Sequence, residues 1–189
     1  MLGRWWDIKY LNQEQTERLF AVIAEPRERA LFGVIYHYGL RVSEATLLLV
    51  QDVDLSGRRI LIHRLKNGRG GERPLFGNTA QAIEAYLAVR QATGSALFTG
   101  RQGGLKRQRI QQLFRGYAER AGLDAQFTVR CLRHSIATHL LEAGFGIEFV
   151  QDHLGHVNIQ NTLIYAKITN RRREAVYRQI EESAEIVKV

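Results

Sequence analysis

The chain has one cysteine, two prolines and no long hydrophobic run, and these scarcities exclude several classes of protein. The single cysteine, Cys131, excludes a disulfide framework and any zinc site that is built on several cysteines. No apolar run approaches the roughly 18 residues that a membrane span needs. The N-terminal residues, which include two tryptophans and an arginine, do not form a signal peptide. We therefore expect a soluble, intracellular protein that does not span a membrane.

Acidic residues are also few for a chain of this size. Lys and Arg number 27 against 19 Asp and Glu, which leaves a net charge of +8 on 189 residues. This excess indicates a polyanionic partner, either nucleic acid or an anionic membrane surface, although a basic surface without a partner gives the same count. The apolar share of 45% and the charged share of 24% are ordinary for a globular domain and exclude a disordered chain.

The pattern of apolar residues predicts a mainly helical fold with one small antiparallel sheet. Asn12, with Gln15 three residues later, is expected to cap a first helix that stops before Pro26. Ser43 and Thr128 are expected to cap two later helices. The sheet is a hairpin of strands 59–64 and 73–76, with a Gly-rich tip at 66–71. The remaining helices are expected over 27–38, 80–91, 106–121, 129–142, 147–153, 158–166 and 171–182, with glycines 39, 122, 144 and 155 at C-terminal ends.

Two segments of the first half place a cation where it could meet a phosphate. Arg41 lies in a tight turn before a helix N-terminus, where backbone amides and the positive end of the dipole favour an anion. The alternative is a surface ion pair with Glu44. Lys66 lies at the Gly-rich hairpin tip, where it could act as a mobile ammonium donor or acid, or be no more than a solvated turn residue.

Two segments of the second half add more cations and a tyrosine. Arg130 and Arg133 are three residues apart in a first helical turn, where they repel each other unless an anion lies between them. His134 and His139 are interpreted as packing or capping histidines, since a third metal ligand is missing and we expect no metal site.

His156 follows Gly155 in a turn, and Tyr165 follows one short helix later. A buried core tyrosine is the alternative for Tyr165 when it is considered alone. The combination of two arginine sites, a lysine, a histidine and a late tyrosine in one basic chain is what favours chemistry on DNA.

Three of these segments resemble the motif boxes of the tyrosine recombinases, the phage integrase family of site-specific DNA recombinases. They are GLRVSE at residues 39–44, LRHSIATHLLEAG at 132–144, and LGH at 154–156 with Thr162 and Tyr165. The stretches RLKNG at 64–68 and 151–165 are similar to those of short, single-domain members such as the invertases that switch fimbrial promoters.

The resemblance implies a tyrosine-recombinase catalytic fold and a role for each matching residue. Arg41 and Arg133 would clamp the scissile phosphate, His156 would hydrogen-bond it, and Lys66 would be the general acid toward the departing 5′ oxygen. Tyr165 would attack phosphorus and form a 3′-phosphotyrosyl intermediate, without a metal or other cofactor. The implied partner is double-stranded DNA, bound by a homotetramer on paired sites in the bacterial cytoplasm, with a monomer in free solution.

The sequence departs from the family at Arg130, where a histidine or lysine is usual. Arginine can donate to a phosphate, but with a pKa above about 12 it cannot accept the tyrosine proton. Arg130 is expected either to bind phosphate or to form an ion pair with a carboxylate such as Asp124.

The chain is also shorter than many members. We expect one catalytic domain over 1–189, with a lead-in over about 1–10, a C-terminal helix and tail over about 171–189, and no N-terminal core-binding domain. The tail is expected to pack either on a neighbouring protomer or on its own domain. DNA-backbone contacts are expected from Arg69, Lys106, Arg107 and Arg109.

Two other functions share parts of this pattern. A type IB topoisomerase has a similar site and would relax supercoils as a monomer without site preference. A DNA-binding regulator that had kept the fold and lost the chemistry is the second alternative. The joint presence of Tyr165, Lys66 and the two arginines favours the recombinase.

Overall fold

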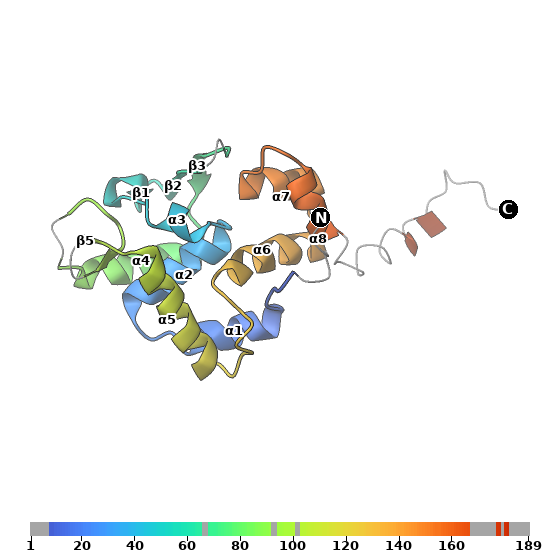
Figure 1. Cartoon of the computed structure of the whole chain (residues 1–189). Coiled ribbons are helices and arrows are strands. Elements are labelled where there is room, and N and C mark those ends of the chain that lie inside the picture. Colours follow the sequence, from blue (N-terminus) through green and yellow to red (C-terminus); the bar gives the residue numbers. More distant parts are fainter. Residues whose placement is uncertain are drawn as a thin grey trace.

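The structure, a computed structural model, describes residues 8–65, 68–91, 94–100, 103–166, 177–178 and 180–181. Helices make up most of the described residues (Figure 1). They are α1 (Gln13–Ala21), α2 (Pro26–His37), α3 (Val42–Ala45), the 3-10 helix η2 (Val50–Asp52), α4 (Gly77–Val89), α5 (Arg107–Arg120), α6 (Arg130–Glu142), α7 (Ile147–Leu154) and α8 (Gln160–Ala166). The helix expected over 171–182 lies largely outside the described residues. In the described ranges, no helix is long and apolar enough to cross a membrane.

The strands form two small antiparallel sheets. The first contains β1 (Val53–Asp54), β2 (Arg59–Ile62) and β3 (Gly71–Pro74) in that order, and it includes the predicted hairpin. Pro74 lies on the edge strand, where a missing backbone donor is tolerated. The second sheet pairs β4 (Thr99–Gly100) with β5 (Gly103–Gly104). Its strands are two residues each and rich in glycine, so the sequence pattern did not predict them.

Helix α1 begins where its capping residues predict. The Asn12 side chain accepts from the Gln15 amide at 2.8 Å, and the Gln15 side chain accepts from the Asn12 amide at 3.0 Å. Helix α2 begins with Pro26, whose fixed φ suits the first helical position. Gly39, with φ of 55°, follows the end of α2 in the left-handed conformation that was expected there.

Two predicted caps are wrong. Ser43 lies inside α3, because the Glu44 carboxylate accepts from the Arg41 amide at 2.8 Å and makes Arg41 the capping residue. Thr128 does not cap α6, whose N-cap is Val129. The chain enters α6 through tight i to i+3 bonds, the first from the Cys131 amide to the Thr128 carbonyl at 2.8 Å.

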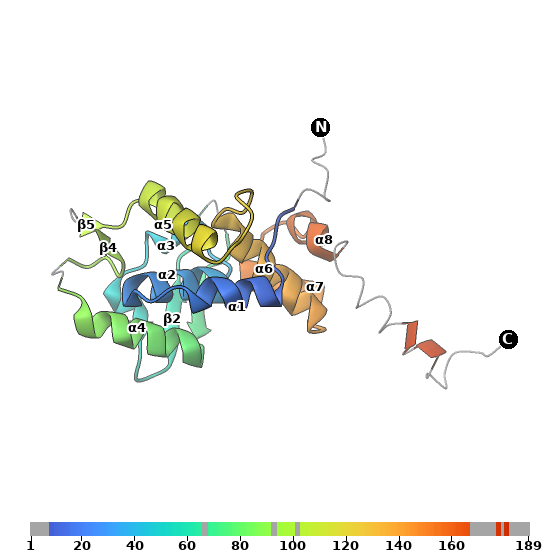
Figure 2. The ribbon, with the colours of Figure 1, turned by 90° about the horizontal axis from the view of Figure 1, so that it is seen from below.

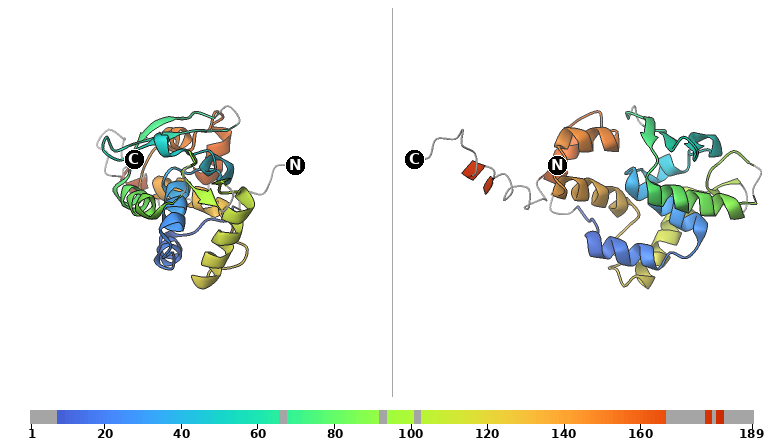
Figure 3. Two further views of the ribbon diagram at one scale, coloured as in Figure 1. Left: turned by 90° about the vertical axis from the view of Figure 1, so that its left-hand side faces the viewer. Right: turned by 180° about the vertical axis from the view of Figure 1, so that it is seen from behind.

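The core consists of two clusters, and the site described below lies between them. The larger cluster surrounds α2, whose residues 30–35 are all buried. Figure 2 shows α1 and α2 in the middle of the molecule, with α4 on one side and α5 on the other. The smaller cluster joins α6, α7 and α8, and the view from behind in Figure 3 shows it at one end of the molecule. Helix α6 contacts both α2 and the pair α7 and α8, and so connects the two clusters.

Candidate active site

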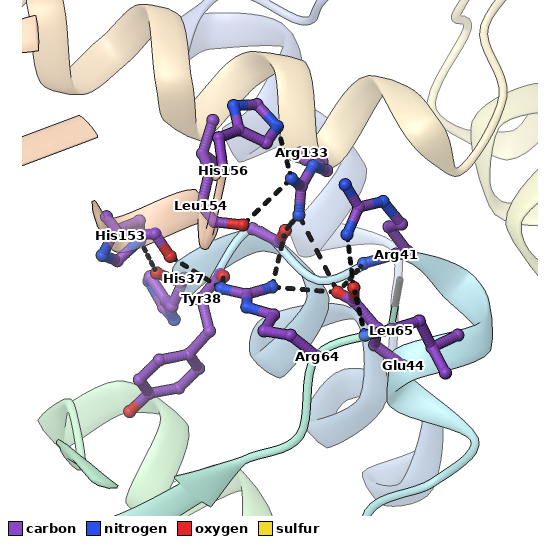
Figure 4. Close-up of polar contacts among 11 residues, drawn as sticks. His37, Tyr38, Arg41, Glu44, Arg64, Leu65, Arg133, His153, Leu154 and His156 are labelled. Carbon is purple, nitrogen blue, oxygen red and sulfur yellow. Dashed lines mark hydrogen bonds and ion pairs between the residues drawn. The ribbon is translucent and has the colours of Figure 1, made fainter. Parts of the chain in front are cut away.

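Three arginine side chains surround one buried carboxylate, that of Glu44 (Figure 4). Arg41 Nη1 lies 2.6 Å from Glu44 Oε1, and Arg64 Nη1 lies 2.9 Å from Oε2. Arg133 Nη1 is 3.8 Å from the same Oε2. The three guanidinium groups exceed the single carboxylate by two positive charges. An excess of fixed positive charge at a mostly buried place is an environment suited to an anion such as phosphate.

Glu44 is ionised despite its burial. Burial acts to raise the pKa of its carboxyl group, but the Arg41 amide, the charge of Arg64 and the hydrogen bonds from both arginines outweigh it and lower that pKa. The negative charge on Glu44 in turn attracts the guanidinium of Arg41, the residue that precedes α3. The ion pair that was considered as an alternative role for Arg41 therefore exists, and it is part of this cluster.

Arg64 connects three segments that are distant in the sequence. Its Nη2 donates to the Tyr38 carbonyl at 2.8 Å and to the His153 carbonyl at 2.6 Å. Its side chain is only 3% exposed. The end of the β2 hairpin, the turn after α2 and the end of α7 are thus joined by one guanidinium.

Arg133 and His156 form a hydrogen-bonded pair whose protonation follows from the donors available. Arg133 Nη2 lies 2.7 Å from His156 Nε2, and His156 Nδ1 lies 2.9 Å from Thr162 Oγ1. Because a guanidinium only donates, Nε2 accepts and the ring hydrogen on Nδ1 is donated to Thr162. Burial and then the charges of Arg133, Arg41 and Arg64 lower the pKa of His156 to about 3, so the ring is neutral at pH 7. Arg133 also donates to the carbonyls of Gly39 and Leu154.

Two glycines allow the turns of this site to approach each other closely. A Cβ on Gly39 would lie 2.5 Å from a methyl group of Leu154, and one on Gly155 would lie 2.8 Å from the Arg69 carbonyl oxygen. Both glycines have positive φ, 55° and 66°. The absence of a side chain at Gly39 therefore lets the turn that carries Arg41 approach the end of α7, and its absence at Gly155 lets the turn that carries His156 approach the hairpin.

Tyr165 is brought to this cluster by α8. Its side chain is buried, and its hydroxyl lies 2.8 Å from His134 Nδ1. Burial raises the pKa of the Tyr165 hydroxyl, and the charges of Arg133, Arg130 and Arg41 act to lower it. The Tyr165 hydroxyl is thus buried within the field of three arginines.

Arg130 lies at the start of α6 and is exposed. Its positive charge acts to lower the pKa values of His134 and Tyr165. Among the described residues it forms no ion pair with a carboxylate, and Asp124 instead accepts from the Gln126 amide at 2.8 Å. The alternative in which Arg130 pairs with Asp124 is wrong in this structure.

The other predicted residues are either exposed or outside the described part. Lys66 is outside the described residues. Arg69 is exposed close to Gly155, and Lys106, Arg107 and Arg109 are exposed at the start of α5. In the described ranges, no group of three or more His, Cys, Asp or Glu side chains could hold a metal ion.

Sequence reasoning did not assign Arg64 or His134 to this site. For Arg64 a signal was present, because β2 alternates exposed and buried residues and Ile60, Ile62 and Arg64 share the inward side. A charged residue at an inward position needs buried partners. For His134 the interpretation as a packing histidine came from treating it apart from Tyr165, which is 31 residues away.

The structure resembles solved recombinases over most of its length. It superposes on the crystal structure of XerA recombinase with a TM-score of 0.79 and 27% identity, covering 90% of this chain and 63% of that one. It also superposes on the Tn1549 transposon integrase in complex with transposon right end DNA, with a TM-score of 0.77 and 20% identity, covering 92% of this chain and 66% of that one. The predicted fold class is confirmed.

Sequence comparison agrees with the structural match. The chain is 36% identical over 166 residues to tyrosine recombinase XerC of Pelotomaculum thermopropionicum, covering 81% of this chain and 53% of the relative. It is 38% identical over 154 residues to tyrosine recombinase XerD of Mycobacterium tuberculosis, covering 76% and 48%. The chain thus spans about half the length of these relatives. Because the profile of the phage integrase family also matches residues 9–172, the chain belongs to that family, as its motif boxes predicted.

Proposed function

We propose that this protein is a site-specific DNA recombinase that cuts and rejoins DNA strands through a covalent tyrosine intermediate. The observation that carries the proposal is the buried hydroxyl of Tyr165 in the field of a cluster with more guanidinium groups than carboxylates. A nucleophile beside excess fixed positive charge is suited to attack on a phosphodiester. Relatives named tyrosine recombinases, and a XerH recombinase structure bound to its palindromic difH substrate, support DNA as the substrate.

The roles proposed for the residues follow from their geometry and charge. Arg41, whose side chain is 38% exposed, and Arg133 would bind the non-bridging oxygens of the scissile phosphate. Tyr165 Oη would attack phosphorus and leave a 3′-phosphotyrosyl bond and a free 5′ hydroxyl. Lys66 is proposed as the acid that protonates the 5′ oxygen.

His156 requires a change of hydrogen bonds before it can bind the phosphate. In the structure its Nε2 accepts from Arg133, so this nitrogen has no hydrogen to donate. A phosphate that takes over the Arg133 donor would free Nε2 and, through its negative charge, favour the protonated ring. We propose that His156 donates to the phosphate only in the DNA-bound enzyme.

The proposed partner is double-stranded DNA, on which the protein would act as a homotetramer at paired sites in the bacterial cytoplasm. Arg69, Lys106, Arg107 and Arg109 are proposed to bind the DNA backbone, since all four are exposed. Replacing such a residue with alanine should weaken binding about equally for all DNA sequences and should lower the dependence of binding on salt.

The test is formation of a covalent adduct. A library of nicked suicide duplexes with a randomised central sequence is incubated with the protein, and adducts that survive SDS are isolated and sequenced. We expect adducts enriched in one sequence, and we expect Tyr165→Phe to abolish them while DNA binding is retained. Mapping of the DNA to Tyr177, or adduct formation by the Tyr165→Phe variant, would show that the nucleophile is assigned wrongly.

A further inference from the structure

The His134 side chain forms a hydrogen bond with the proposed nucleophile. Its Nδ1 lies 2.8 Å from the Tyr165 hydroxyl oxygen, and the two ring centroids are 5.5 Å apart. Both side chains are almost completely buried, with 8% of His134 and 2% of Tyr165 exposed. In the described part of the chain, no other side chain hydrogen-bonds to this hydroxyl. The contact is therefore protected from solvent and specific to one nitrogen atom.

Among the described residues, the other charged and titratable groups of the site offer no free acceptor for this proton. Arg130 and Arg133 carry guanidinium groups, which have donors and no acceptor. Glu44 accepts from both Arg41 and Arg64 and is held by their charges. His156 accepts from Arg133 at Nε2 in the free protein, and in the DNA-bound enzyme the same nitrogen is proposed to donate to the phosphate.

We propose that His134 is the general base of the cleavage reaction, which fills the function that Arg130 cannot supply. The inference rests on the proposed function, because it requires Tyr165 to be the nucleophile. As Oη forms its bond to phosphorus, the phenolic proton passes to His134 Nδ1. The bond between phosphorus and the 5′ oxygen breaks, and that oxygen leaves with the electron pair and takes a proton from the general acid. In rejoining, the 5′ hydroxyl gives its proton back to the conjugate base of the general acid as it attacks phosphorus. The bond between phosphorus and the Tyr165 oxygen breaks, and the His134 imidazolium returns its proton to that departing oxygen.

The charges around His134 fit this role. Burial, followed by the charges of Arg130 and Arg133 from its own helix, lowers the pKa of His134 to about 4. The ring is therefore neutral at pH 7, and the tautomer with hydrogen on Nε2 leaves Nδ1 free to accept from Tyr165 of α8. A bound phosphate diester carries a negative charge that offsets the two guanidinium charges. Its arrival raises the pKa of His134, so the base becomes stronger when substrate is present.

The test compares two histidines of the same helix. His139 Nδ1 also lies 2.8 Å from a tyrosine hydroxyl, that of Tyr36, and the ring is also buried, but Tyr36 is not a proposed nucleophile. Single-turnover cleavage of the selected suicide duplex is measured for His134→Asn and His139→Asn, normalised to folded protein. We expect the first variant to be slower by about 10²-fold or more and the second to cleave at the normal rate.

Two chemical rescues separate proton acceptance from a structural role. Fluorinated tyrosine at position 165 has a lower hydroxyl pKa, so it loses its proton more easily. The His134→Asn variant that carries it should cleave at least tenfold faster than the His134→Asn variant with ordinary tyrosine. A substrate with a 5′-bridging sulfur needs no acid for the leaving group, and it should not restore the rate of this variant. A packing defect would not respond to the acidity of the nucleophile. If thermal denaturation shows that His134→Asn does not fold, His134→Gln is measured in the same way.

The outcomes distinguish this inference from the proposed function. Normal or faster cleavage by a folded His134 variant overturns the base assignment, and so does rescue by the sulfur-containing substrate or a failure of fluorotyrosine to help. If the unmodified protein forms no adduct, or forms one without Tyr165, the proposed function itself fails.

Discussion

Glu44 sets the charge balance of the proposed active site, although it has no part in the proposed chemistry. It is the carboxylate that faces Arg41, Arg64 and Arg133, and its side chain is fully buried. Without its negative charge, the buried guanidinium groups of Arg64 and Arg133 would have carbonyl oxygens as partners and no counter-ion within this cluster. Charged groups in such surroundings are tolerated only when they are paired and hydrogen-bonded.

Replacing Glu44 with glutamine should therefore destabilise the fold strongly. Breaking a buried ion pair by removing one partner costs about 3–5 kcal/mol, and urea unfolding at pH 7 measures it. The matched control is Glu72→Gln, because Glu72 pairs with Arg59 at 3.2 Å on the surface with 60% of its side chain exposed, and it should change stability by less than about 1 kcal/mol. Since the pKa of Glu44 is lowered in the folded state, its contribution is present above the unfolded carboxyl pKa and is lost as the pH falls below it. Equal stability of the two variants would mean that Glu44 does not balance the arginines.

The charge of Arg130 is unfavourably placed in the free protein. Its charge opposes the positive end of α6 and that of Arg133, and it has no ion pair among the described residues. Arg130→Ala should leave the melting temperature of the free protein unchanged or slightly raised, while adduct formation falls and its dependence on salt becomes weaker. A variant that melts earlier but cleaves normally per folded molecule would remove Arg130 from the active site.

At the scale of elements, the sequence predicted those whose signals are local. The capping pair of Asn12 and Gln15 and the glycines at helix ends are short-range features, and each fixed a boundary. The predictions that Ser43 and Thr128 cap helices were wrong because other groups satisfy the first amides. The Glu44 carboxylate does so at α3, and the backbone carbonyls of the turn before α6 do so at α6. Capping is decided by which neighbour satisfies the first amides of a helix.

The site itself depends on contacts that no local pattern contains. Arg64 meets the carbonyl of His153, which is 89 residues later, and Arg133 meets the carbonyl of Gly39, 94 residues earlier. The family resemblance named Arg41, Arg133 and His156, which the structure brings together, whereas Lys66 lies outside the described residues. The buried connections through Arg64 and the pairing of His134 with Tyr165 required the structure.

Gly155 lies where the end of α7 approaches the hairpin closely, and a substitution there tests whether this approach is needed. It follows α7 with φ of 66°, and a Cβ there would lie 2.8 Å from the Arg69 carbonyl oxygen and 2.9 Å from Arg64 Nε. Gly155→Ala should cost more than about 2 kcal/mol, since left-handed strain alone costs roughly 1–2 kcal/mol, and it should also slow cleavage. The matched control is Gly116→Ala within α5, where nothing lies within 4 Å of the new Cβ and alanine should stabilise the helix by up to about 1 kcal/mol. A Gly155→Ala variant as stable as the original chain would show that the turns do not need this contact.

For the whole molecule, the polar cluster is also the junction between the two hydrophobic clusters. The larger cluster contributes Gly39 and Glu44 through the end of α2 and α3, and the smaller one contributes Leu154 and Tyr165. Arg64 and Arg133 donate across this junction to carbonyls on both sides. Stability and the geometry of the site are therefore coupled, because separating the clusters would break the contacts that hold Arg133, which the proposed chemistry uses, and those that hold Arg64.

The histidines at this junction should make the stability of the whole protein fall in mild acid. Burial, together with neighbouring arginine charges, lowers the pKa of His134 and of His153 to about 4 and that of His156 to about 3. In the unfolded chain these rings take up protons near their ordinary pKa of about 6.5, whereas the folded protein keeps them neutral. The stability that they provide is thus present above pH 6.5 and is lost as the pH falls toward their folded pKa values. When the pH is lowered from 7 to 5, each of these three histidines should decrease the free energy of unfolding by about 2 kcal/mol.

His153 is the residue with which to measure this effect, because it has no proposed role in catalysis. Its Nε2 donates to the His37 carbonyl at 2.8 Å, so His153→Gln removes both a hydrogen bond and a titrating group. At pH 8 the variant should be less stable than the original chain, because only the loss of the hydrogen bond acts there. At pH 5 the difference in stability should shrink or change sign. The original chain is then destabilised by protonation of His153 in its unfolded state, and the variant, which lacks this histidine, is not. Urea unfolding at both pH values gives the comparison, and a stability difference that is the same at pH 8 and pH 5 would show that His153 is not held neutral by the fold.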